Sequence, residues 1–91
     1  MLRLNCFFKA NDGKTEEALS AAKALVAESL NDEGCVAYDV FQSATRPDVL
    51  LICETWDNDR ALAKHSVSSH FKKYVGELEK LGQMKIEKFN F

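Results

Sequence analysis

A carboxylate, an indole and two imidazoles fall within one short stretch of this chain, between Glu54 and His70. Glu54 and Trp56 lie two residues apart at the end of an apolar segment, so on a strand their side chains would point to the same face. His65 and His70 follow in segments with helical patterning. These groups would therefore meet at one strand-to-helix corner. Such a corner can wall a small apolar pocket with a few polar groups, the usual make-up of a small-molecule site.

Within this corner, His65 and Glu54 are the candidate catalytic residues. An imidazole titrates near neutral pH, so His65 could move a proton or bind a substrate oxygen. We expect a neutral ring that faces the pocket and is held by Glu54. The alternative for His65 is a histidine on a helix flank with a solvent or backbone partner, and Glu54 could serve only to orient it. His70 is expected at a helix N-terminus or an interface.

Five further residues are candidates for substrate binding. Trp56, Phe71 and Tyr74 would wall the pocket, and an indole also offers one N–H donor. Asn5 and Tyr38 could supply polar contacts to substrate oxygens from neighbouring strands. Plain core or rim packing is the alternative for Trp56.

The sequence predicts neither a metal site nor a bound cofactor. His65 and His70 are five residues apart, which on one ideal helix turns them about 140° away from each other, unlike a chelating i, i+4 pair. No Gly-x-Gly-x-x-Gly, phosphate loop or Cys-x-x-Cys-His occurs. Cys6, Cys35 and Cys53 are odd in number and widely spaced, so we expect free, buried thiols rather than a disulfide framework.

Composition narrows the class of protein. The 91 residues form a single domain (1–91), and 46% of them are hydrophobic, above the fraction of a disordered chain. The formal charge is −2 with acids and bases well mixed, so nucleic acid is not an expected partner. No apolar run is long enough to span a membrane. The N-terminus lacks the pattern of a secretory signal, and we expect a cytoplasmic protein.

Periodicity predicts four strands and three helical segments. The expected strands are Leu2–Lys9, Cys35–Gln42, Val49–Trp56 and Met84–Phe91, and the expected helices are Lys14–Leu30, Asp57–Lys64 and Ser69–Leu81. Asp12 is a plausible N-cap for the first helix, and the serines at 66, 68 and 69 would cap the last. Gly34 suits a left-handed turn after the first helix. On that helix, the buried stripe would run from Ala18 to Leu30.

The order β-α-β-β-α-β predicts an α+β, ferredoxin-like split β-α-β fold: a four-stranded antiparallel sheet with its helices on one face. The other face would then be apolar, because Val49–Trp56 is nearly continuous in apolar residues through Cys53 and because Phe7, Phe89 and Phe91 need cover. We therefore expect a homodimer packed sheet to sheet.

Several motifs resemble the antibiotic biosynthesis monooxygenase domain family over nearly the whole chain. They are Glu33–Tyr38, Glu54–Trp56, Ala61–His65 and Ser69–Phe71, in this order and spacing. The resemblance implies a dimeric α+β barrel with a pocket between helices and sheet in each subunit. Many members look like cofactor-independent oxygenases of quinols or polyketide-type aromatics, in which the protein binds and orients the substrate and accepts a proton while O₂ reacts with it.

Other activities in the same superfamily remain open. The haem-degrading branch is similar in Asn5 and Trp56, but its ligand histidine would fall at Lys72–Val75, where this chain has none. A branch that isomerises a phosphorylated dione signalling sugar is similar over His65–Tyr74, and proton shuttling by His65 would suit that reaction. A small-molecule-binding module without turnover is the third alternative.

Overall fold

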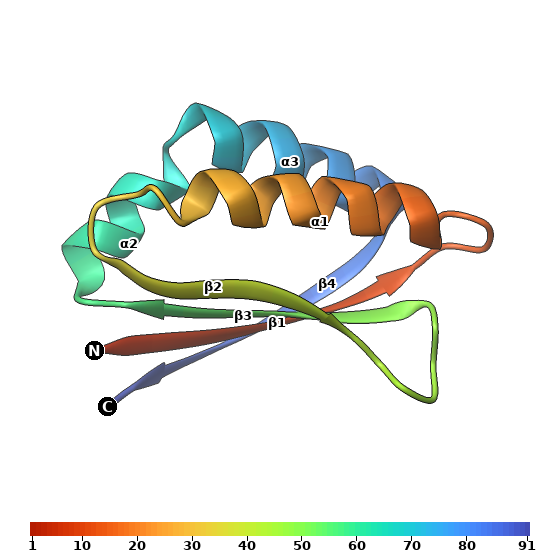
Figure 1. Ribbon diagram of the computed structural model, residues 1–91, viewed down its shortest axis with the longest axis horizontal. Coiled ribbons are helices and arrows are strands. Elements are labelled where there is room, and N and C mark those ends of the chain that lie inside the picture. Colours follow the sequence, from red (N-terminus) through yellow and green to blue (C-terminus); the bar gives the residue numbers. More distant parts are fainter.

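Four antiparallel strands and three helices make up the computed structural model, which describes all 91 residues. The elements are β1 (Leu2–Ala10), α1 (Thr15–Ser29), β2 (Cys35–Gln42), β3 (Val49–Trp56), α2 (Asp59–Ser66), α3 (Ser69–Leu81) and β4 (Gly82–Asn90). The strand order in the sheet is β2-β3-β1-β4, and the helices lie on one face of it (Figure 1). The predicted ferredoxin-like architecture is confirmed. None of the three helices combines the length and the apolar composition of a membrane-spanning segment.

The element boundaries follow the predictions closely, with local corrections. β1 and β4 extend further than predicted where Ala10 pairs with Gly82, so β4 runs from Gly82 to Asn90 rather than from Met84 to Phe91. The predicted bounds of β2, β3 and α3 are those observed. Helix α2 begins two residues later than predicted, because the Asn58 side chain caps it by accepting a hydrogen bond from the Ala61 N–H at 2.9 Å. Asp12 does not cap α1: that helix follows Lys14, and no side chain bonds to its first N–H groups. Leu30, predicted to be buried, is 53% exposed because it sits just beyond the last turn of α1.

Alternation along the strands gives the sheet one face under the helices and one face that no helix covers. Leu4 pairs with Glu54 and Phe8 pairs with Leu50, and all four side chains are buried on the helix side. The intervening residues point to the opposite face. Its large apolar side chains are exposed: Phe7 by 41%, Phe41 by 52% and Phe89 by 50%.

The turn between α1 and β2 is fixed against α2 by a glycine. Gly34 has φ +80°, and a Cβ built there would overlap the Cβ of Ala61. The Gly34 carbonyl also accepts a hydrogen bond from the Asp57 N–H at 2.9 Å. A side chain at position 34 would thus push this turn away from α2, and with it Asp32, which lies two residues earlier in the turn.

We predict that Gly34→Ala destabilises the fold more than Gly13→Ala. Both glycines have positive φ, which costs an alanine about 1–2 kcal/mol, but nothing lies within 4 Å of a Cβ at Gly13. The overlap with Ala61 adds about 1–3 kcal/mol at position 34. Urea unfolding of the two variants measures the difference. Equal losses would show that the close approach to α2 is not a constraint, and recovery of stability in Gly34→Ala with Ala61→Gly would locate the overlap.

Candidate functional site

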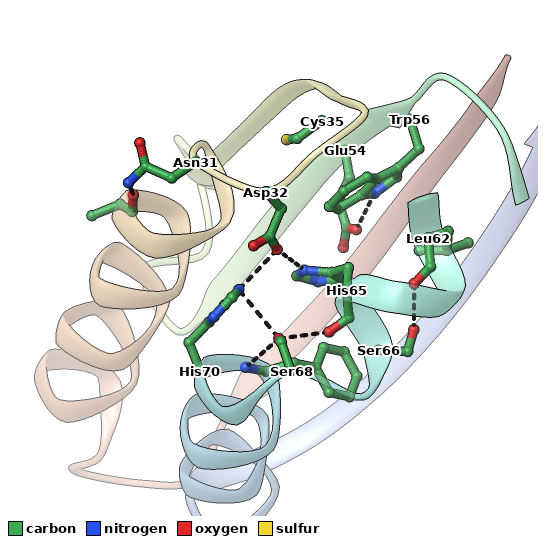
Figure 2. Close-up of polar contacts among 12 residues, drawn as sticks. Asn31, Asp32, Cys35, Glu54, Trp56, Leu62, His65, Ser66, Ser68 and His70 are labelled. Atoms are coloured by element: carbon green, nitrogen blue, oxygen red, sulfur yellow. Dashed lines mark hydrogen bonds and ion pairs between the residues drawn. The ribbon is translucent and has the colours of Figure 1, made fainter. Parts of the chain in front are cut away.

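Glu54 and Trp56 are joined by a hydrogen bond on the helix-covered face of β3. The Trp56 indole N–H donates to Glu54 Oε1 at 2.9 Å, and both side chains are buried (Figure 2). The prediction that the two share one face is confirmed. Burial raises the pKa of Glu54 to about 6, although the indole N–H and the Tyr38 hydroxyl act in the opposite direction. Glu54 is therefore a buried carboxyl that titrates close to neutral pH.

The partner of His65 is Asp32 rather than the predicted Glu54. His65 Nδ1 lies 2.7 Å from Asp32 Oδ2, in the turn between α1 and β2 (Figure 2). The Trp56 ring lies against the imidazole, with 4.5 Å between ring centroids. The indole N–H donates its hydrogen bond to the Glu54 carboxylate. The prediction that Glu54 holds His65 is thus wrong, because the indole takes that carboxylate and the imidazole bonds to the turn instead.

The charge states of Asp32 and His65 determine which nitrogen of the His65 ring carries the proton. Partial burial would raise the pKa of Asp32, but hydrogen bonds from His65 and His70 outweigh it and hold that pKa below its usual value. Burial lowers the pKa of His65, and the attraction of Asp32 does not reverse this. We therefore assign a neutral imidazole whose Nδ1–H donates to an ionised Asp32. His65 Nε2 then carries the lone pair, and this buried atom has no hydrogen-bond partner.

His70 meets the same carboxylate oxygen from the other side. Its Nε2 lies 2.8 Å from Asp32 Oδ2 and 3.2 Å from Ser68 Oγ. The prediction that the two histidines point apart assumed one continuous helix, and it is wrong. Helix α2 ends at Ser66 and α3 begins at Ser69, so each imidazole approaches Asp32 from its own helix. Ser68 caps α3 through the Phe71 N–H at 3.2 Å, which confirms the predicted capping role of a serine here.

Two more of the predicted residues join His65, and two do not. The Phe71 ring stands edge-on to the imidazole, with 5.2 Å between ring centroids. The centroid of the Tyr38 ring lies 5.6 Å from that of the imidazole and 6.3 Å from that of the Trp56 ring. Tyr74 instead borders a surface groove between α1 and α3. Asn5 lies on the opposite face of the sheet, where its Oδ1 accepts a weak hydrogen bond from the Cys53 thiol at 3.6 Å.

Asn5 is thus a wrong prediction for a pocket that contains His65. The orientation of Asn5 away from the helices follows directly from the alternation along β1, because Leu4 and Cys6 on either side of it face the helices. Asp32 was missed because its turn was interpreted only as the end of a helix. An acidic residue two positions before the left-handed Gly34 was the available signal.

The rings around His65 pack against one another in this structure. Trp56, His65 and Tyr38 are each at most 4% exposed. The cavity that reaches the imidazole measures about 120 Å³ and opens on the Asp32 side, lined also by Ser68 and Lys64. Small-molecule sites usually measure about 300–1,000 Å³. A substrate would therefore need at least one ring, such as the half-buried Phe71, to move aside.

The ferredoxin-like fold of this chain is shared with proteins of one family. The sequence matches the antibiotic biosynthesis monooxygenase family over residues 1–77. It is 31% identical over 81 residues to "Putative monooxygenase YcnE" of Bacillus subtilis (strain 168), a match that covers 89% of this chain and 85% of that protein. The chain therefore belongs to the antibiotic biosynthesis monooxygenase family, and the names of its relatives support a monooxygenase-like function.

Solved structures agree with this placement. A conserved protein of unknown function from Bacteroides thetaiotaomicron VPI-5482, described as a possible oxidoreductase, is 52% identical, with a TM-score of 0.96 over 99% of this chain and 96% of that one. PA3566 from Pseudomonas aeruginosa is 31% identical, with a TM-score of 0.92 over 99% and 92% of the two chains. A structure called antibiotic biosynthesis monooxygenase, at 20% identity and a TM-score of 0.93, covers 100% of this chain and 98% of its own and supports the fold alone.

We predict that Glu54→Gln changes stability in a pH-dependent way. The folded pKa of about 6 lies above the ordinary glutamate value of 4.5, so the folded state binds the proton more tightly and loses stability as pH rises from 4.5 to 6. Glutamine keeps an acceptor for the indole and has no charge to bury. Its stability relative to wild type should therefore rise by about 2 kcal/mol between pH 4 and pH 8.

Urea unfolding across this pH range tests the prediction. Glu28→Gln, on the exposed surface of α1, removes the same charge without burial and should give a nearly flat difference. A flat difference for Glu54→Gln as well would mean that its carboxylate is not strained by burial.

Proposed function

We propose that this protein is a cofactor-independent monooxygenase that oxidises a small aromatic, quinol-type substrate with O₂. The observation that supports it is the state of His65: Nδ1 is held by Asp32, and Nε2 is buried with a free lone pair. A buried acceptor without a partner is unfavourable, so it favours a ligand that brings an O–H or an acidic C–H to that atom. The family of this chain agrees with this class of reaction.

In the proposed reaction, the substrate is the reductant and O₂ the oxidant. His65 Nε2 takes a proton from the hydroxyl or activated methylene group, and the electron-rich anion passes electrons to O₂. Where a CH₂ group is oxidised, one oxygen atom becomes the new carbonyl, and the other leaves as water with the two hydrogens. The chain contributes orientation and a proton acceptor, each worth several powers of ten in rate.

The neighbours of His65 have separate roles in this proposal. Asp32 keeps the proton on Nδ1 and stabilises the imidazolium that forms when Nε2 is protonated. Phe71 and Trp56 contact the substrate ring, and Tyr38 contacts a substrate oxygen. Glu54 fixes the indole, and its pKa of about 6 also allows it to exchange a proton with the substrate near neutral pH.

The isomerase alternative uses the same base but needs a different environment. A phosphorylated dione carries negative charge, and the Asp32 carboxylate contacts the imidazole directly at 2.7 Å. Lys64 borders the cavity at His65, but its ammonium is already paired with Glu33 at 3.1 Å. A neutral phenolic substrate is therefore the better match to the charges of this site.

We predict that His65→Ala lowers the rate of quinol or anthrone oxidation by about 10²–10⁴-fold, the usual contribution of a general base. Oxygen uptake with a panel of such substrates measures the rate, with Lys72→Ala on the exposed face of α3 as the control. Circular dichroism verifies that the variant is folded. Wild-type rates in folded His65→Ala would remove the imidazole from the mechanism.

Carbon–proton exchange in a phosphorylated dione without O₂ uptake would favour the isomerase, and tight binding without turnover would favour a binding module.

We also propose that a second copy of the chain covers the far face of the sheet. Phe7, Phe41 and Phe89 expose about half of their surface there, and Phe91 lies beside them with Arg3 5.8 Å above its ring. Four large apolar groups on one face are unusual for a monomer and typical of an interface. Packing two such faces together gives the two-fold arrangement expected for this fold.

Light scattering after size exclusion is predicted to give twice the 10.2 kDa mass of one chain. Phe7→Glu places a charge on β1, in the interior of the sheet, and should shift the population to monomers. Val67→Glu is the matched control, because Val67 is 67% exposed in the turn between α2 and α3. A wild-type monomer, or a dimer that tolerates Phe7→Glu, would contradict this interface.

A further inference from the structure

Three potential metal ligands from three different elements converge on one point. Asp32 comes from the turn after α1, His65 from α2 and His70 from the first turn of α3 (Figure 2). The carboxylate oxygen and the two ring nitrogens all lie within 4.8 Å of one another. The side chain of His65 is 1% exposed, that of His70 16% and that of Asp32 20%. These groups are therefore held in place, and they remain reachable from solvent on one side.

We propose that Asp32, His65 and His70 form a binding site for a divalent transition metal ion of the zinc class. Two imidazole nitrogens and one carboxylate oxygen are a common set of protein ligands for zinc, with a fourth position left to water. Bonds of about 2.0–2.2 Å require ligand atoms roughly 3.3 Å apart in a tetrahedral site, so shifts of about 1 Å would suffice. Mg²⁺ and Ca²⁺ prefer oxygen ligands and match this set poorly.

The surroundings allow an ion to reach this point. The cavity of about 120 Å³ is bordered by Asp32, His65 and Ser68, and it leaves room for a water molecule as the fourth ligand. Lys64 borders the same cavity, but its ammonium is paired with the carboxylate of Glu33 at 3.1 Å. Glu33 thus offsets the one cation near the opening. Metal binding would replace the two hydrogen bonds that Asp32 now accepts with two stronger metal–nitrogen bonds.

Occupation of the site would block the proton acceptor at His65. A metal bound at Nδ1 displaces the ring proton, and a neutral imidazole then carries its hydrogen on Nε2. The buried lone pair that receives the substrate proton is thereby lost. The metal would act as a reversible inhibitor rather than as a cofactor. This consequence rests on the proposed function, whereas the metal site itself does not.

Direct titration of the whole protein with Zn²⁺ by calorimetry tests the site without any activity assay. We expect one ion per chain, and Asp32→Asn and His70→Ala should each weaken binding at least tenfold. Glu28→Gln changes an exposed carboxylate on α1, away from the cavity, and Cys35→Ser removes the thiol closest in sequence to Asp32, so both should bind as wild type does. Absence of saturable binding, wild-type affinity in Asp32→Asn and His70→Ala, or loss of binding in Cys35→Ser would each overturn the proposal.

Nitrogen NMR of the histidine rings gives a second readout. On addition of Zn²⁺ the His65 ring should change from the form protonated at Nδ1 to the form protonated at Nε2, and a chelator should reverse the change. Retention of the Nδ1 proton at full occupancy would mean that His65 is not a ligand. Inhibition of oxygen uptake by Zn²⁺ would support the inference that the bound metal blocks His65 as the proton acceptor. Stimulation by bound Zn²⁺ would leave the site standing and refute the proposed metal-free mechanism.

Discussion

The hydrogen bonds at the Asp32 carboxylate hold the candidate site together. One oxygen accepts from the imidazoles of two helices, at 2.7 Å from His65 and 2.8 Å from His70. The carboxylate can reach both because Gly34 lets its turn lie directly against α2. Without that close approach, α2 and α3 would lose a common anchor, and the orientation of the His65 ring would be free to change. The turn therefore determines which nitrogen of His65 faces the interior.

Two buried or partly buried carboxylates on the same side of the sheet are driven to different pKa values by their surroundings. Asp32 accepts hydrogen bonds from two imidazoles, which stabilise its ionised form. Glu54 loses more to burial than it gains from the indole and the nearby hydroxyl, and its pKa rises to about 6. One carboxylate is thus a fixed charge that polarises His65, while the other can be neutral or charged near physiological pH. Pairs of groups separated in this way are a feature of proton-transfer sites.

Sequence patterns were sufficient for the fold but only for part of the site. Alternation and helical spacing define the strands and helices, because each element must bury one face, and the pairing of Glu54 with Trp56 follows from the same two-residue period. The hydrogen bond from His65 to Asp32 spans 33 positions and depends on a turn geometry that periodicity does not describe. The approach of His70 depends on the break between α2 and α3, which the helical spacing predicts, but the angle of about 140° between the two histidines was derived for one continuous helix.

The closed packing around His65 has a consequence for how the chain could work. A base that is buried at rest is protected from water and from unwanted protonation, and its pKa is held down by the same burial. Opening the ring cluster for a substrate would cost apolar contacts of Phe71 and Trp56, which a flat aromatic molecule can replace between the same rings. A polar or phosphorylated molecule could not replace them. Selectivity for a neutral aromatic substrate thus follows from the packing that closes the site as well as from its charges.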